Sequence, residues 1–433
     1  MSAPGDDLKA AIDAFIAEAR SVAMDRVFAL VGGKIADLRR ATGGEMVGPC
    51  PACRAGTDRF TINFAKGVWH CRQCDGGKGG DGLALVAQVH GFNLRSKSGL
   101  LGACEEILGR SAPDGSERET DAERAERQKR LEARQADNEK SRKQQDDFAE
   151  RERARAISQG RGFYFNAAPG AGSPVEAYLK ARLAVDVLPA GLWANLRYAT
   201  NHSFYHGRDD RGHAVEVHCG PAMIAPLIDP VGHFARVGEV TGAHQTWIDL
   251  DQQPKFRPLL FDDKGEALPT KKMRGHFKGS IIPLLGDLSA LRWLCGEGIE
   301  TTGWLAAQEG WREDTFYFAA GSLGNISGPA NPDSAFYHPT LTKQDSAGRA
   351  RRVKVAGPVP KPGSAGDCFQ VPAHVTELVI GADGDCEPVR TMSDMARAKA
   401  RLARPGLSVS IWWPPEGMDW ADLGQVTSTK CGI

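Results

Sequence analysis

The sequence predicts an α/β protein that contains a parallel sheet in its C-terminal part, an α+β section before it and a zinc ribbon near the N-terminus. The apolar segments 291–296, 377–381 and 407–412 are continuous, which is typical of strands that are buried on both faces. Helix-like segments at 301–308 and 391–403 follow the first two, and this alternation predicts parallel strands. Two Cys-x-x-Cys pairs, separated by 17 residues, indicate the metal-binding ribbon.

Length and composition set the wider limits. A chain of 433 residues with 41% hydrophobic and 25% charged residues predicts a globular protein of two to four domains. The formal net charge is zero, so a site for a polyanion has to come from a local patch of charge. No apolar run is long enough for a bilayer and no signal pattern opens the chain, so we expect a cytoplasmic protein without a membrane partner. Six of the ten cysteines are scattered singly, which favours a reduced compartment over a disulfide framework.

The predicted zinc-ribbon domain covers residues 1–110. Apolar residues at helical spacing within 8–36 predict one or two helices, with a break at Gly32 and Gly33. The later cysteines follow the pattern Cys-x2-Cys-x17-Cys-x2-Cys, and each pair can place two thiolates on one tetrahedral ion. Thioredoxin-like redox chemistry needs only one such pair, so we predict one structural zinc held by Cys50, Cys53, Cys71 and Cys74.

The run 48–86 resembles the zinc-binding domain of bacterial and phage primases. It carries a cysteine pair, a Phe-containing strand, a His-Cys-x-x-Cys pair and a helix led by Gly-Gly-Asp, in this order, with Cys53 where many bacterial primases have histidine. The resemblance implies that the ribbon helps to select a site on single-stranded DNA. Nearby cations could contact phosphates and nearby aromatic residues could stack on bases: Arg54, Arg59, Lys66, Arg72, Lys78, Phe60, Phe64 and Trp69. For Phe60 and Phe64 we favour a place in the small core over base stacking. For Trp69 the sequence does not decide between these two roles.

A charged linker is predicted at 111–160, and the N-terminal subdomain of a catalytic core at 161–286. The linker has high helix propensity but no apolar stripe, so it is expected to be a solvated helical or partly disordered tether. After it, Ser173-Pro174-Val175-Glu176 forms a capping box for a helix that ends near Arg182. Strand-like segments follow at 222–229, 234–240 and 246–250. Four histidines lie close together but fit no common metal-site spacing, so we interpret them as incidental loop residues: His202, His206, His213 and His218.

A basic run at 271–279 precedes the predicted parallel sheet. Its cations are candidates for nucleotide or template phosphates, with Lys272 and Lys278 as first choices, and the alternative is a solvated hairpin tip. The candidate phosphate-binding residues are Lys271, Lys272, Arg274 and Lys278.

Acidic residues follow the predicted strands. Glu297 ends the first, and Asp383 and Asp385 follow the second, where the i, i+2 spacing places both carboxylates on one side. The carboxyl ends of parallel strands meet at one edge, and clustered carboxylates need a cation such as Mg²⁺. These motifs resemble the Toprim fold of primases, topoisomerases and some nucleases, and this resemblance covers 287–433.

That resemblance implies that Glu297, Asp383 and Asp385 hold the catalytic metal, as two Mg²⁺ or Mn²⁺ ions. The pair Asp419-x-x-Asp422 resembles a further acidic motif found after the last Toprim strand in phage and plasmid primases, and it completes the candidate catalytic set. The loop 321–325 is expected at the same edge. The insertion 327–369 is long for a connection without secondary structure, which indicates a flap or disorder.

Together, the ribbon and the Toprim motifs predict a DNA primase, a nucleotidyltransferase that makes short RNA primers on single-stranded DNA from nucleoside triphosphates. A Toprim nuclease and a non-catalytic adaptor that binds single-stranded DNA are the alternatives. None of the tyrosines lies in a recognisable DNA-cleavage domain, which argues against a topoisomerase. The chain lacks Gly-x4-Gly-Lys-Ser/Thr, so we expect a replicative helicase in trans, and a phage or plasmid origin.

Overall fold

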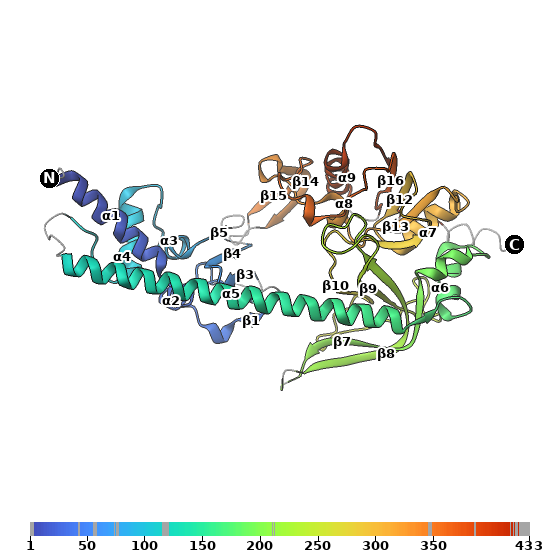
Figure 1. Ribbon diagram of the computed structural model, residues 1–433, viewed down its shortest axis with the longest axis horizontal. Helices are drawn as coiled ribbons and strands as arrows, with labels where there is room; N and C mark the ends of the chain where they lie inside the picture. The colour runs from blue at the N-terminus through green and yellow to red at the C-terminus, as the bar shows by residue number, and fades with distance from the viewer. Residues whose placement is uncertain are drawn as a thin grey trace. The chain divides into compact units, whose positions relative to one another are not determined.

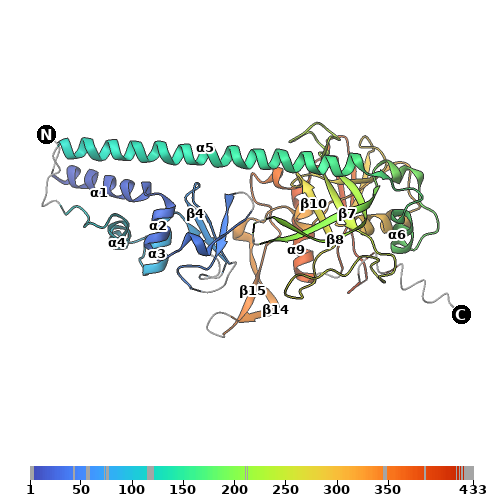
Figure 2. The ribbon, with the colours of Figure 1, turned by 90° about the horizontal axis from the view of Figure 1, so that it is seen from below.

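The computed structural model shows an α/β protein with several sheets (Figures 1 and 2). It describes residues 4–41, 44–54, 59–72, 74, 78–114, 121–209, 211, 213–344, 349–384, 387–415, 417–418, 420 and 423. The chain divides into two compact units, 1–152 and 153–433, and each is considered by itself. No helix in the described part is long and apolar enough to cross a bilayer.

The first unit joins a small antiparallel sheet to short helices. Its helices are α1 (Pro4–Ser21), α2 (Met24–Leu30), α3 (Gly82–His90) and α4 (Lys97–Leu108). Its strands, in sheet order, are β1 (Arg39–Arg40), β2 (Met46–Gly48), β3 (Phe60–Asn63), β4 (Val68–Cys71) and β5 (Lys78–Gly80). The carboxylate of Asp81 accepts the Ala84 backbone N–H at 2.9 Å, so the Gly-Gly-Asp sequence begins α3 as an N-cap.

Aromatic rings fill the core of the first unit. Phe60 is fully buried and stacks on Phe28 and on Trp69, with ring centroids 5.7 and 5.9 Å apart. The Trp69 indole donates to the Asp81 carbonyl oxygen at 3.1 Å. The core interpretation of Phe60 is confirmed, and Trp69, which the sequence left open, is also a core residue.

Helix α5 (Asp121–Asn166) is one continuous element and ends later than the predicted linker (Figure 1). Its last turns belong to the second unit. There Arg161 pairs with Glu239 at 2.9 Å and Tyr164 is buried. A Cβ at Gly160 would lie 2.1 Å from the Arg274 carbonyl oxygen, so glycine allows the helix to lie against a strand. Tertiary packing therefore extends the helix beyond residue 160.

The second unit begins with helix α6 (Pro174–Leu183) and an antiparallel sheet. Ser173 caps α6 as predicted and accepts the Val175 N–H at 3.2 Å. Glu176 accepts the N–H of Gly172, not that of Ser173, so the reciprocal pair of a capping box is not formed. The strands, in chain order, are β6 (Ala168–Pro169), β7 (Arg197–Arg208), β8 (Ala214–Ile228), β9 (Val240–Trp247) and β10 (Lys271–Gly275).

Two predictions for this sheet are wrong. Residues 234–239 form no strand, because the buried carboxylate of Asp229 accepts backbone N–H groups from Val231, Gly232, Phe234 and Ala235 and folds the segment into a loop. The histidines are not all loop residues: His202 and His206 lie on β7 and His218 lies on β8.

The second sheet is mixed and has the order β11-β13-β12-β16-β17. Its strands are β11 (Ile282–Leu285), β12 (Arg292–Gly296), β13 (Thr315–Ala319), β16 (Glu377–Gly381) and β17 (Ser408–Trp412). Strand β12 is parallel to β13 and β16, and β16 is parallel to β17, whereas β11 is antiparallel to β13. The expected parallel sheet thus needs a correction at one edge. Residues 286–291, between β11 and β12, are too few for the crossover that parallel strands require.

Helices cover both faces of this sheet. Helix α7 (Ile299–Gln308) packs Leu305 into the cluster that contains Leu294, and α9 (Pro388–Leu402) packs Met395 into the cluster that contains Trp293. Neighbouring β12 residues thus point to opposite covered faces, which is the physical reason for the continuous apolar segment.

The insertion 327–369 contains secondary structure, contrary to the expectation of an irregular connection. Helix α8 (Leu323–Ser327) leads into it, and β14 (Phe336–Gln344) and β15 (Ala350–Val355) form an antiparallel hairpin. The apolar alternation that would mark such strands in a sequence is missing, because most of their side chains are exposed.

Candidate active site

A cavity of about 270 Å³ lies at the carboxyl ends of β12 and β16. Glu297 directly follows β12 and Asp383 follows β16 by two residues, and both line the cavity. The two acids are 86 positions apart (383 − 297) and meet because their strands are parallel neighbours. Cations and polar groups from the preceding subdomain complete the wall: Arg182, His244, Lys255, Arg257 and Lys271.

The turn that carries Glu297 is braced by a buried hydroxyl. The Thr302 Oγ1 atom accepts the Gly296 N–H at 2.9 Å and donates to the Gly298 carbonyl oxygen at 2.9 Å. A Cβ at Gly296 would lie 2.7 Å from the Thr301 side chain, so only glycine lets the helix start so close to the strand. Thr302 therefore fixes the carboxylate-bearing turn between β12 and α7.

The loop that carries Asp383 is held by the last strand and by the segment after it. The Ala382 N–H donates to the Trp412 carbonyl oxygen at 2.8 Å, and the Trp420 indole donates to the Ala382 carbonyl oxygen at 2.8 Å. A Cβ at Gly384 would lie 2.1 Å from the Met418 carbonyl oxygen. The predicted site residues Asp385, Asp419 and Asp422 lie outside the described residues.

Lys271 reaches the cavity through a buried ion pair. Its Nζ lies 2.7 Å from Glu300 Oε2, and the Tyr178 hydroxyl donates to Glu300 Oε1 at 2.5 Å. Burial alone would raise the pKa of Glu300, but the charge and hydrogen bond of Lys271 outweigh it and hold that pKa well below its usual range. Glu300 is thus an anion that ties β10 and α6 to the start of α7, a role that the sequence analysis missed.

The other predicted basic residues lie away from the cavity wall. Side chains alternate along a strand, so Lys272 is on the opposite face of β10 from Lys271. The Lys272 Nζ lies 3.7 Å from the centre of the Phe204 ring. Arg274 donates to Gln159 at 2.8 Å, and Lys278 pairs with Asp367 at 2.9 Å. Lys271 is the one member of the four that lines the cavity.

A short loop supplies two cations that the sequence analysis did not select. Lys255 and Arg257 line the cavity, and Arg182 holds this loop by donating to the Pro254 carbonyl oxygen at 3.3 Å. The Arg257 Nε atom is buried and has no hydrogen-bond partner among the described residues. The sequence Pro254-Lys255-Phe256-Arg257 places two cations close together in a predicted loop, and this pattern could have marked them as candidate phosphate-binding residues.

His244, on β9, is a buried polar residue of the same wall. Burial, with a further contribution from the Lys271 charge, lowers its pKa to about 4. The ring is therefore neutral near neutral pH, and it can accept or donate a hydrogen bond inside the cavity.

In the first unit, four cysteines form a compact cluster. The Sγ atoms of Cys50, Cys53, Cys71 and Cys74 all lie within 4.8 Å of one another, with Cys50 to Cys74 at 3.6 Å and Cys53 to Cys71 at 3.9 Å. Sulfur atoms of a tetrahedral zinc site with Zn–S bonds of about 2.3 Å are separated by similar distances. The cluster could hold one zinc ion, as the spacing predicts.

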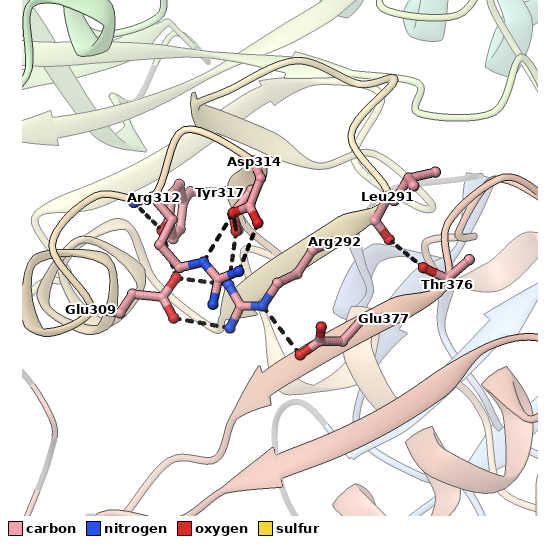
Figure 3. Close-up of polar contacts among 9 residues, drawn as sticks. Leu291, Arg292, Glu309, Arg312, Asp314, Tyr317, Thr376 and Glu377 are labelled. Atoms are coloured by element: carbon pink, nitrogen blue, oxygen red, sulfur yellow. Dashed lines mark hydrogen bonds and ion pairs between the residues drawn. The ribbon is translucent and has the colours of Figure 1, made fainter.

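In the second unit, the amino edge of the β11-β13-β12-β16-β17 sheet, opposite the cavity, carries a network of paired charges (Figure 3). Both terminal nitrogens of Arg292 contact the carboxylate of Glu309, at 2.8 and 2.9 Å, and Arg292 Nε contacts Glu377 at 3.2 Å. The Tyr317 hydroxyl donates to Glu309 at 2.5 Å, and Arg312 pairs with Asp314 at 2.7 Å. The charged side chains of this edge are therefore paired with one another.

Comparison with known proteins gives limited likeness. Residues 154–284 match a family model described as a domain of unknown function, DUF7146. No curated protein matches the chain at a significant level.

Two solved structures are similar over much of their length. The primase of Aquifex aeolicus, with its zinc-binding and RNA polymerase domains, is 14% identical, with a TM-score of 0.32, over 94% of this chain and 83% of that one. A DNA primase domain from Pseudomonas aeruginosa is 12% identical, with a TM-score of 0.33, over 63% of this chain and 74% of that one. Scores this low do not define a shared fold, so the functional argument rests on the residues themselves.

Proposed function

We propose that the protein is a DNA primase of the phage or plasmid type, a nucleotidyltransferase that joins ribonucleotides on a single-stranded DNA template. One observation carries the proposal: two carboxylates from neighbouring parallel strands, Glu297 and Asp383, face Lys255, Arg257 and Lys271 across one cavity. Acids for a divalent cation and bases for phosphate are the two halves that nucleotidyl transfer requires.

The carboxylates fit the predicted metals. Glu297 and Asp383 offer hard oxygen donors in the cavity, and Asp385 would add a third from the same loop. When bound, Mg²⁺ or Mn²⁺ would lower the pKa of a primer 3′-hydroxyl and neutralise charge on the leaving pyrophosphate. Asp419 and Asp422 would extend this set, because Trp420, between them in the chain, donates to Ala382 beside Asp383.

The basic wall would hold the triphosphate of the incoming nucleotide. The Arg257 guanidinium has a buried Nε–H to donate, and the Lys271 ammonium is fixed in place by Glu300. Guanidinium groups bind phosphate oxygens in bidentate fashion, which orients the α-phosphate toward the attacking hydroxyl. Lys272, Arg274 and Lys278 lie on or beyond β10, where contacts to template phosphates remain a prediction.

The four-cysteine cluster supports a structural role for a zinc ion. Four thiolates leave no open coordination position, so the zinc would fold the ribbon that selects a template site. A replicative helicase acting in trans remains part of the proposal.

A primer-synthesis assay tests this function. Purified protein is incubated with single-stranded DNA, labelled ribonucleoside triphosphates and Mg²⁺ or Mn²⁺, in parallel with the variants Asp383→Asn and Asp385→Asn. Short labelled products from the unaltered protein and none from either variant are expected. Asp263→Asn, an exposed acid in a turn of the same unit, is the matched control and should keep full activity.

Other outcomes would contradict the proposal. Loss of the template without synthesis, abolished by the same variants, would indicate the Toprim nuclease. Intact DNA binding without products, even when helicases from a phage or plasmid source are added, would indicate the adaptor.

A further inference from the structure

The two strands of the β14–β15 hairpin are exposed and carry cations. Figure 2 shows the hairpin projecting from the body of its own unit. Residues 336–344 and 349–355 contain the cations Lys343, Arg349, Arg351, Arg352 and Lys354, whereas the acid Asp345 belongs to the connection, outside the described residues. All of these cations are exposed. Arg352 and Lys354 do not line the cavity and form no ion pair with the described residues.

The base of the hairpin is fixed rigidly to the body of the unit. The β14 strand bulges after Tyr337, and the buried His338 ring accepts the Thr340 and Leu341 N–H groups at its Nδ1, at 3.1 and 2.7 Å. The opposite ring nitrogen therefore carries a proton and donates to Glu387 at 2.8 Å. Glu387 caps α9 by accepting the Val389 and Arg390 N–H groups.

A second anchor holds both ends of the insertion. The Arg397 guanidinium, on α9, donates to the carbonyl oxygens of Gly328 and Gly357 at 2.9 and 2.6 Å. The Ser393 hydroxyl donates to the Ala356 carbonyl oxygen at 2.7 Å. The hairpin is thus attached to the helix whose cap begins four positions after Asp383, the acid of the cavity (387 − 383).

The register places two of the cations on one face of the ribbon. Arg352 and Lys354 are two positions apart on β15 and therefore point to the same side, which they share with their cross-strand neighbours Thr342 and Tyr337. Exposed cations on one face favour binding of a polyanion, because binding releases the polyanion's counterions.

An aromatic residue accompanies the cations. Tyr337 is 64% exposed and lies opposite Lys354, and Leu341 is 41% exposed on the bulge. A phenol ring next to a lysine offers a stacking platform for a base beside a contact for its phosphate, which is the pattern that single-stranded nucleic acids use.

We propose that the β14–β15 hairpin binds single-stranded nucleic acid on one face, with Arg352 and Lys354 on its phosphates and Tyr337 against a base. The anchor through His338 and Glu387 attaches this ribbon to the cap of α9, which follows the loop of Asp383 in the chain. The identity of the strand as the template rests on the proposed primase function.

Fluorescence anisotropy with a labelled 25-nucleotide single strand, in a titration of salt and without nucleoside triphosphates, tests the hairpin. The variant Arg352→Ala/Lys354→Ala should bind at least about fivefold more weakly at 150 mM salt. The slope of log K against log salt should fall by about 1.4, since each lost contact to a single strand removes about 0.7. Tyr337→Ala should weaken binding about fivefold or more with an unchanged salt slope.

Two further variants control for charge and for folding. Lys264→Ala/Lys399→Ala removes two exposed cations elsewhere in the unit and should bind like the unaltered protein. Arg352→Lys/Lys354→Arg keeps the charge and should restore binding. Thermal denaturation should show the same melting temperature for all variants, because every altered side chain is exposed.

Some results would overturn the hairpin proposal. These are equal affinity of Arg352→Ala/Lys354→Ala and the unaltered protein, tighter binding to a duplex of the same length, or equal competition by polyglutamate. Failure of the primase function would instead appear as no primers from the unaltered protein, with the hairpin variants still weakened in binding. The two failures are therefore distinguishable.

Discussion

The two edges of the β11-β13-β12-β16-β17 sheet both carry charged side chains, but these side chains make different contacts. At the amino edge, Arg292 contacts Glu309 and Glu377, and Arg312 contacts Asp314 (Figure 3). At the carboxyl edge, Lys271 pairs with Glu300, whereas Glu297, Lys255 and Arg257 form no ion pair with the described residues.

This difference distinguishes charged groups that stabilise the fold from charged groups that are available to bind a ligand. In the amino-edge network Arg292 is buried and Glu309 is largely buried, so loss of their ion pair should lower stability. At the carboxyl edge Glu297 lines the cavity and forms no ion pair with the described residues, so its carboxylate is available to a cation. Substitutions at the carboxyl edge should therefore lower activity and keep stability, whereas substitutions at the amino edge should lower stability and keep activity.

The largest expected effect is on catalysis at the carboxyl edge. Asp383→Asn or Glu297→Gln should lower the rate of primer synthesis by about 10³-fold or more, because each removes an electrostatic ligand of the reacting phosphate's cation. The melting temperature should stay about constant, because these acids line a cavity and are not part of the amino-edge network. Asp314→Asn, at the amino edge, is the control and should keep the rate. A large fall in melting temperature with Asp383→Asn would break the comparison.

The next effect is on stability at the amino edge. Arg292→Met leaves Glu309 without its cationic partner in a site where the arginine side chain is 8% exposed, although the Tyr317 hydroxyl still donates to it, and should lower the free energy of unfolding by about 3 kcal/mol. Urea denaturation measures this change, and primer synthesis at 20 °C should persist. Adding Glu309→Gln to this variant should recover part of the loss. An unchanged urea midpoint in Arg292→Met would show that the network is not a stabilising element.

An intermediate effect is expected where the fold supports the site. Thr302→Val leaves the buried Gly296 N–H without an acceptor and should cost about 1–3 kcal/mol of stability. Because the same hydroxyl fixes the Glu297 turn, the rate of synthesis should also fall several-fold at temperatures where the variant is folded. Thr302→Ser keeps the hydroxyl and should restore the rate. Equal rates for the valine and serine variants would contradict a positioning role.

The smallest effect concerns pH. Because burial lowers the pKa of His244 from 6.5 to about 4, the unfolded chain binds a proton in this window and the folded chain does not. Stability should therefore decrease as pH falls from about 6.5 to 4, and His244→Gln should flatten this decrease in melting temperature. His213→Gln, at an exposed histidine, should leave the curve unchanged. A curve that His244→Gln does not alter would show that the ring titrates normally.

Much of the candidate site follows from local patterns. The zinc ligands, the helix cap at Ser173 and the strand ends at Glu297 and Asp383 could be predicted, because spacing and periodicity act over a few residues. The basic run 271–279 was predicted, but the sequence did not show which of its cations lines the cavity. Lys271 and Lys272 differ only in the face of β10 to which they point. The hairpin in the insertion was missed because exposed strands need no apolar alternation.

The sequence by itself determined the cysteine ligand set, the alternation of strands and helices, and the presence of acids where strands end. Those features depend on local backbone preference and on burial of apolar faces. The tertiary structure decided the antiparallel direction of β11, the loop made by Asp229, and the meeting of Tyr178, Lys271 and Glu300 beside the cavity. Partners that lie 29 to 122 positions apart are brought together by packing between elements, and no local pattern encodes that contact.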